Sequence, residues 1–125
     1  MNSETILLRQ VHPNFYPNGE LTSQAFFPFP KDDGKVSVYD NDQIDAASSY
    51  EHYTKVLNYK SSSVWGITCD EVSKNGLESI SDPLENFPSH AVVDFLDRSE
   101  KDCRRLAKRL KSLALQRGCL FLPAS

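Results

Sequence analysis

The longest regular pattern in this sequence is an apolar stripe from Cys103 to Ala114, which predicts a helix over residues 99–117. Ser99-Glu100-Lys101-Asp102 is typical of a helix N-terminus, and Gly118 stands where a left-handed cap would end the helix. Because such a helix is apolar on one side only, the rest of the chain must supply a surface for it to pack on. The apolar residues recur at three- and four-residue spacing and are Cys103, Leu106, Ala107, Leu110, Leu113 and Ala114.

The other regular segments are short, and prolines or glycines separate them. Alternation with a period of two and β-branched residues favour strands, whereas spacing of three and four residues favours helices. Thr68-Cys69-Asp70-Glu71 has the form of a capping box and predicts a short helix that ends near Asn75-Gly76. Strands are expected at residues 5–11, 20–27, 35–39, 64–67 and 90–95, and a helix capped by Asp42 is expected at residues 42–57.

These elements predict an α+β fold with a mixed, largely antiparallel sheet of roughly four to six short strands. The two main helices, 42–57 and 99–117, are expected to pack on one face of the sheet. Strand 90–95 is apolar on both sides and is therefore expected at the sheet centre, while the apolar segment 119–123 should return as an edge strand or dock against the core. A chain of 125 residues has the usual length of one domain, which here is residues 1–125.

The expected compartment is the cytoplasm. No apolar run approaches the roughly 18 residues that span a bilayer, and the first residues lack the pattern of a signal peptide. The 3 cysteines are an odd number at wide spacing, which predicts reduced thiols rather than a disulfide framework. Cys103 and Cys119 lie in apolar patterns and are expected in the core, whereas Cys69 could be an exposed, reactive thiol at a helix N-terminus.

Charge divides the chain into an acidic body and a basic end. Residues 1–98 hold 7 Lys and Arg against 15 Asp and Glu, a net charge of −8, and residues 99–125 hold 7 against 2, a net charge of +5. Six cations cover the side of the last helix opposite its apolar stripe, and we call this set the basic face: Lys101, Arg104, Arg105, Lys108, Arg109 and Lys111.

Three interpretations of the basic face stay open. It could be a solvated surface that offsets the acidic body, a docking surface for an acidic protein partner, or a surface that neutralises the phosphates of nucleic acid. Nucleic acid is disfavoured, because no helix-turn-helix, zinc-finger or glycine-rich pattern accompanies the cations and the acidic body would repel phosphates.

Residues that could carry catalysis are dispersed along the sequence. Five of them could line one cleft if strands 5–11 and 35–39 and the helix after them are neighbours, and a cation, a hydroxyl and a carboxylate together suit transfer chemistry on phosphorylated nucleotides. The alternative is that they are surface charges and an ordinary strand tyrosine. No HxH, HExxH or CxxC spacing is present, so neither a metal site nor a cofactor is predicted. The cleft candidates are Arg9, His12, Ser37, Tyr39 and Glu51, with His90 at the start of strand 90–95 as a further candidate.

Several short segments resemble small bacterial proteins of unknown function. They are Leu7-Leu8-Arg9-Gln10-Val11-His12-Pro13, Ser23-Gln24-Ala25-Phe26, Ser37-Val38-Tyr39-Asp40 and the strand His90-Ala91-Val92-Val93-Asp94-Phe95. The resemblance covers most of the chain and implies a bacterial source. It implies no activity and no role for any residue.

The function expected from the sequence is that of a small, non-enzymatic accessory or regulatory protein that acts through a partner protein in a bacterial gene cassette. The partner is expected to present an acidic surface to the basic face, because segregated charge is what steering between complementary surfaces requires. One alternative is a small enzyme that acts on nucleic acid or a nucleotide through Arg9, His12, Tyr39 and Glu51 or His90. A second alternative is direct binding of nucleic acid by the last helix.

Overall fold

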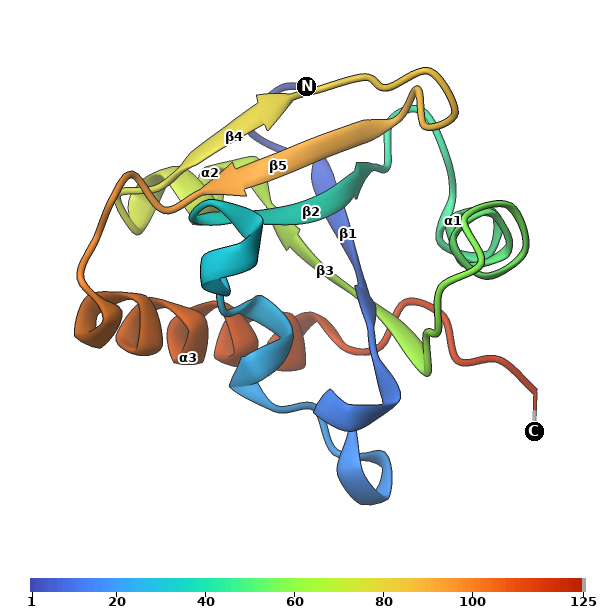
Figure 1. Cartoon of the computed structure of the whole chain (residues 1–125), viewed down its shortest axis with the longest axis horizontal. Helices are drawn as coiled ribbons and strands as arrows, with labels where there is room; N and C mark the ends of the chain where they lie inside the picture. Colours follow the sequence, from blue (N-terminus) through green and yellow to red (C-terminus); the bar gives the residue numbers. More distant parts are fainter. Residues whose placement is uncertain (125) are drawn as a thin grey trace.

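Five strands form one antiparallel sheet in the order β3-β1-β2-β5-β4 (Figure 1). The structure is a computed structural model and describes residues 1–124. The α+β class and the largely antiparallel sheet that the sequence predicts are confirmed. The strands are β1 (Ile6–Val11), β2 (Lys35–Asp40), β3 (Ser63–Thr68), β4 (Glu78–Ser81) and β5 (His90–Asp94), and the helices are α1 (Ala46–Glu51), α2 (Cys69–Lys74) and α3 (Glu100–Arg117).

The two faces of the sheet carry separate apolar cores. Side chains alternate along a strand, so Leu7 and Leu8 of β1 point to opposite faces. Leu7 belongs to the core that α3 completes, whereas Leu8 packs with residues of α1 and of the π-helical turn η5 (His52–Val56) that continues it. Figure 1 shows α3 and α1 well apart on different sides of the strands. The expectation that both main helices share one face is therefore wrong, because each face of the sheet has its own apolar set to cover.

Helix α3 forms where the sequence predicts it. The Ser99 hydroxyl accepts a hydrogen bond from the backbone N–H of Asp102 at 3.2 Å, which caps the first turn. Gly118 ends the helix with a φ of +95°. The apolar stripe is buried except for Leu113, which is partly exposed, so the opposite side of α3 is left to solvent.

The predicted helix 42–57 begins later than expected. Asp45 is its N-cap and accepts from the backbone N–H of Ser48 at 2.7 Å. Asp42, the predicted cap, instead accepts a hydrogen bond from the Thr5 hydroxyl, while Asp40 accepts from the Asp42 backbone. The residues 41–44 are thereby held in a turn, and the helix starts at Ala46.

Three further expectations for the sheet are corrected. Residues 20–27 contain no strand but the 3₁₀ helix η3 (Ser23–Phe26). Ala25 and Phe26 both pack into the core beneath α3, whereas adjacent residues of a strand would point to opposite faces. β4 was not predicted, since its sequence is mostly polar and exposed. With β4 at the edge, the sheet centre is β2, and β5 lies one strand away from it.

The C-terminal segment reaches the opposite edge of the sheet. Phe121 forms a single antiparallel bridge with Val64 of β3, and the Val64 backbone N–H donates to the Phe121 carbonyl at 2.9 Å. This agrees with the expected return of residues 119–123 to the sheet. Cys119, however, is exposed and not in the core.

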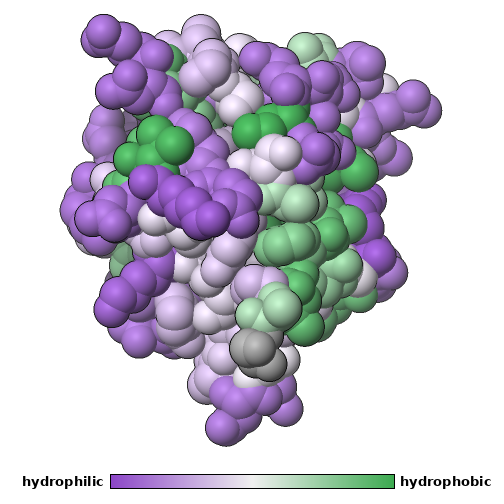
Figure 2. Space-filling view, turned by 90° about the vertical axis from the view of Figure 1, so that its right-hand side faces the viewer, coloured by the Kyte–Doolittle hydropathy of each residue, from purple (hydrophilic) through white to green (hydrophobic). Residues whose placement is uncertain are grey.

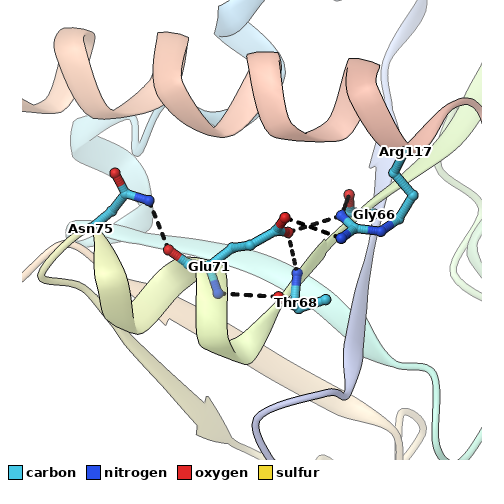
Figure 3. A network of polar contacts seen from close by, with 5 residues as sticks. All are labelled: Gly66, Thr68, Glu71, Asn75 and Arg117. Carbon is cyan, nitrogen blue, oxygen red and sulfur yellow. Dashed lines mark hydrogen bonds and ion pairs between the residues drawn. The ribbon is translucent and has the colours of Figure 1, made fainter.

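A polar network ties α3 to the rest of the fold (Figure 3). The Thr68 and Glu71 side chains form the predicted capping box of α2. The Glu71 carboxylate also accepts two hydrogen bonds from the Arg117 guanidinium, at 2.9 and 3.1 Å, and Arg117 donates a further one to the Gly66 carbonyl at 3.0 Å. The last turn of α3 is thus joined to β3 and α2.

Candidate functional site

The basic face lies on the solvent side of α3. Five of its six residues are exposed, and Lys111 is partly exposed. Two of the arginines have carboxylates beside them on the same helix: Arg104 pairs with Glu100 at 2.9 Å, and Arg105 lies 3.8 Å from Asp102. Such exposed pairs contribute about 0.5 kcal/mol or less and leave the cations accessible.

The other four cations of the basic face have no such partner. Within residues 1–124, no carboxylate oxygen comes within 4.0 Å of the side-chain nitrogens of these residues: Lys101, Lys108, Arg109 and Lys111. The acidic body therefore does not neutralise this surface by direct contact. Leu115 lies in the same exposed sector, four residues after Lys111, and is 47% exposed. The basic face thus has an apolar side chain at its border.

The helix that presents the basic face is held at both ends and along its length. Leu106 and Leu110 are about 1% exposed and pack against the sheet. The Ser99 cap holds the first turn, and the Arg117 to Glu71 pair holds the last. The cations therefore project from a backbone that cannot readily move away from the sheet.

Of the predicted cleft residues, Arg9 serves the backbone of the sheet. Its Nε donates to the Ala25 carbonyl at 2.6 Å and its Nη1 donates to the Ser37 carbonyl at 2.9 Å. β1 and β2 are paired at only two positions, where Leu7 lies opposite Asp40 and Leu8 lies opposite Tyr39. The Arg9 guanidinium therefore reaches a carbonyl of β2 beyond the paired stretch. Burial lowers the pKa of Arg9 below its ordinary value, although the neighbouring Tyr53 and Asp32 oppose this.

Tyr39 and His52 form a hydrogen-bonded pair on the α1 face of the sheet. The Tyr39 hydroxyl lies 2.6 Å from His52 Nδ1, and His52 Nε2 lies 2.7 Å from the Asn86 carbonyl oxygen. Because that carbonyl can only accept, Nε2 carries the proton and Nδ1 accepts from Tyr39. Burial, followed by the nearby Tyr53, raises the pKa of the Tyr39 phenol well above its ordinary value.

His90 makes a second chain of contacts on the same face. Its Nε2 lies 3.1 Å from the Ser37 hydroxyl, and its Nδ1 lies 2.9 Å from the carbonyl oxygen and 3.1 Å from the carboxylate of Asp82. The Phe87 ring packs between the two histidines, with centroids 4.7 Å from His90 and 5.0 Å from His52. The loop between β4 and β5 is thus fastened to the sheet through both imidazoles.

The structure does not bring the whole predicted cleft set together. Arg9, Ser37, Tyr39 and His90 come from three adjacent strands, β1, β2 and β5, whereas His12 and Glu51 are used elsewhere. The His12 imidazole accepts from the Asn14 backbone at the end of β1. The exposed Glu51 carboxylate pairs with Lys55 at 2.7 Å on the outer side of the helix.

The predicted cleft set does not include two residues of the cluster, His52 and Asp82. His52 directly follows Glu51 in the chain, and it is this histidine, not Glu51, that contacts Tyr39. Asp82 could have been found from the hairpin: β4 and β5 pair Ser81 with Ala91, so the next residues outward, Asp82 and His90, lie opposite each other. Recognition of β4 was the missing step.

Two surface cavities lie away from this cluster. One of about 500 Å³ opens between the segment after η3 and the start of α3, where Phe27, Phe95 and Arg98 are among the lining residues. A second, of about 410 Å³, is lined by Phe15, Gln24, Phe29, Pro30 and Lys31. None of the candidate residues from the sequence lines either cavity.

The cysteines and acidic residues offer little further chemistry. Cys69 is partly buried at the start of α2, and burial raises the pKa of the Cys103 thiol above its ordinary value. Within residues 1–124, no group of three or more His, Cys, Asp or Glu side chains is arranged to hold a metal ion.

The side of the molecule that carries α1 and the C-terminal segment has a band of apolar side chains beside hydrophilic ones (Figure 2). Val56 at the end of η5, which continues α1, and Leu122 of the C-terminal segment are 63% and 62% exposed. No helix in residues 1–124 combines the length and the apolar character needed to cross a bilayer.

Comparison of the chain with protein-family models, curated proteins and solved structures finds no match.

Proposed function

We propose that this protein is an accessory or regulatory binding module that docks on an acidic surface of a partner protein through its basic face. The observation that carries the proposal is the group of cations without intramolecular carboxylate partners on a helix that is held firmly against the sheet: Lys101, Lys108, Arg109 and Lys111. Complementary charge speeds and orients such encounters, and a rigid backbone loses little conformational entropy on binding.

A protein partner is favoured over nucleic acid by what surrounds the cations. Leu115 adds an exposed aliphatic side chain to the same sector of α3, and protein interfaces place apolar residues among polar ones. Glu100 and Asp102 lie at the start of the helix beside Arg104 and Arg105, where they would repel a phosphate backbone. An acidic protein surface can avoid these two carboxylates, whereas a regular array of phosphates cannot easily do so.

The enzyme alternative that the sequence left open is less well supported. Arg9 donates to two main-chain carbonyls, which removes two of its donors from any substrate. His12 accepts from the Asn14 backbone and Glu51 pairs with Lys55, whereas Tyr39 and His90 have other partners. A cleft that combines all five residues is not what these contacts favour.

The proposal is tested by capturing partners from a native lysate with the purified protein and reconstituting the complex from the purified components. We expect one stoichiometric partner, whose affinity falls about tenfold or more when Lys108→Glu and Arg109→Glu are combined. A matched control combines Lys31→Glu and Lys60→Glu, two exposed residues outside α3 that change the net charge equally. The control should bind within about twofold of the wild type.

Three results would contradict the proposal. One is the absence of any stoichiometric partner, and another is equal loss of affinity in the two double variants, which would show a response to net charge alone. The third is tight binding of a duplex DNA oligonucleotide with a steep loss of affinity as salt rises, which would favour nucleic acid.

A further inference from the structure

Three side chains on the α1 face of the sheet form a chain of contacts in which His90 of β5 lies between Ser37 of β2 and Asp82 of the loop before β5. Ser37 is exposed, whereas His90 is only 7% exposed and forms part of the floor beside it. The register of β2 and β5 pairs Tyr39 with His90, so Ser37 and His90 point to the same face, two residues apart along the ladder.

The partners of His90 determine where its proton lies. Nδ1 faces two oxygens of Asp82, the carbonyl at 2.9 Å and the carboxylate at 3.1 Å, and both can only accept. Nδ1 therefore carries the hydrogen in the neutral imidazole, and the lone pair of Nε2 is directed at the Ser37 hydroxyl, 3.1 Å away. This is the tautomer in which a histidine can take a proton from a serine.

The surroundings of Ser37 on this face are apolar. Val92 of β5 is paired with Ser37, and Ile80 of β4 is paired with Val92, so both side chains lie on the same face as the hydroxyl. A small acyl group fits beside these two aliphatic side chains.

We propose that Ser37 is a nucleophile for acyl transfer from small carboxylic esters, with His90 as its base and Asp82 as a positioning residue. Ser37 Oγ bonds to the ester carbonyl carbon as its proton passes to His90 Nε2. The bond from that carbon to the leaving oxygen then breaks, and the leaving group takes the proton from His90. Water attacks the acyl-serine, gives one proton to His90, and releases the carboxylic acid as the proton returns to Ser37.

The experiment uses the full-length protein and a fluorophosphonate probe, which labels activated serines, together with 4-nitrophenyl acetate as substrate. We expect labelling at Ser37, located by peptide mass spectrometry, and ester hydrolysis that falls at least about tenfold in Ser37→Ala. Ser81→Ala is the matched control, because Ser81 is an exposed strand serine whose partner Ala91 belongs to the opposite, α3-side core. It should retain the full rate.

Replacement of the buried His90 could disturb folding, so the role of the base is tested at residue 37 as well. If His90 activates this position, the thiol of Ser37→Cys reacts with iodoacetamide at least about tenfold faster than the thiol of Ser81→Cys, with native cysteines separated by peptide mass spectrometry. For Asp82, Asp82→Asn should lower the labelling rate only in part, since the main-chain oxygen still holds Nδ1, and Asp82→Glu should restore some of it.

The proposal is overturned if the folded wild type is not labelled, if Ser37→Ala is labelled and hydrolyses the ester at the wild-type rate, or if the two introduced thiols react equally. These outcomes do not depend on the basic face, because Lys108→Glu with Arg109→Glu should leave the labelling of Ser37 unchanged.

Discussion

Arg117 and Glu71, 46 residues apart in the chain, are joined by two parallel hydrogen bonds of 2.9 and 3.1 Å between the guanidinium and the carboxylate. Both side chains are largely shielded, with 24% and 20% of their surfaces exposed. A bidentate pair of this kind is geometrically specific, and the same Glu71 carboxylate also completes the capping box of α2. The contact therefore fixes the end of α3, and with it the orientation of the basic face.

Glu71→Gln is predicted to lower the free energy of unfolding by about 2 kcal/mol, because it removes charge from hydrogen bonds that Arg117 and the Thr68 backbone make to the carboxylate. Urea denaturation measures the change. Glu51→Gln is the matched control, since the Glu51 to Lys55 pair is fully on the surface, and it should change stability by about 0.5 kcal/mol or less. Equal effects of the two variants would show that the Arg117 contact has no special weight.

The Glu71 contact also makes stability depend on pH at the acid end. Burial raises the pKa of Glu71, but the hydrogen bonds from Arg117 and Thr68 outweigh this and hold the pKa below its ordinary value. A carboxylate with a lowered pKa in the folded state stabilises the fold above its ordinary pKa and ceases to do so as the pH falls through the lowered value. The difference in stability between wild type and Glu71→Gln should therefore shrink from about pH 6 to about pH 3. A difference that stays constant over this range would contradict the account.

Tyr39→Phe is predicted to lower the free energy of unfolding by about 1–2 kcal/mol, because it leaves His52 Nδ1 without the hydrogen bond from the phenol. The raised pKa of Tyr39 adds a dependence on alkaline pH. Above the ordinary pKa of 10.0 the phenol ionises in the unfolded chain and not in the folded one, so wild-type stability falls as the pH rises. Between about pH 8 and about pH 11, the free energy of unfolding should fall less in Tyr39→Phe than in the wild type, as measured by denaturation at the two pH values.

Tyr59→Phe serves as the control for the tyrosine experiment. Tyr59 is 59% exposed. Removal of its hydroxyl should therefore leave the free energy of unfolding, and the dependence of that free energy on alkaline pH, close to the wild-type values. If Tyr59→Phe and Tyr39→Phe reduce the loss of stability at alkaline pH to the same extent, that loss does not come from the buried phenol of Tyr39.

Arg9→Leu is predicted to destabilise the protein by about 2 kcal/mol, and Arg9→Lys by about 1 kcal/mol. Leucine leaves the carbonyls of Ala25 and Ser37 without their donors. Lysine keeps the charge, but its single ammonium cannot reproduce the two separate N–H donors of the guanidinium. Thermal denaturation measures both. Arg104→Leu, on the exposed side of α3, should change stability by about 0.5 kcal/mol or less. A similarly small effect of Arg9→Leu would contradict the bridging role.

The parts of the fold that could be predicted from the sequence are those whose local signals agree with their tertiary contacts. Ser99, the apolar stripe and Gly118 all specify the same helix, and the Thr68 to Glu71 capping box specifies α2 in the same way. The sequence predicts a strand at residues 20–27 that does not form and does not predict β4, and the reasons for the two differences are opposite. In the first, a strand-like composition is overridden by the burial of Ala25 and Phe26 together; in the second, a polar edge strand has no apolar pattern to reveal it.

The candidate sites divide in the same way. The basic face follows from the period of one helix, so its position on the surface could be read from the sequence. The contacts among Ser37, Asp82 and His90 depend on strand order and on the register of β2, β5 and β4, which no local pattern specifies. The exposure of Cys119 was missed for a related reason, since an apolar neighbourhood in sequence does not show which element covers it.

The most direct test of the docking surface is a residue-level footprint of the complex. With the protein labelled with nitrogen-15 and titrated with the purified partner at physiological salt, the proposal predicts that the largest amide shift changes lie on residues 101–115 of α3, and that added salt reverses them. Shift changes confined to β2, β5 and the loop between β4 and β5, with α3 unperturbed, would contradict it.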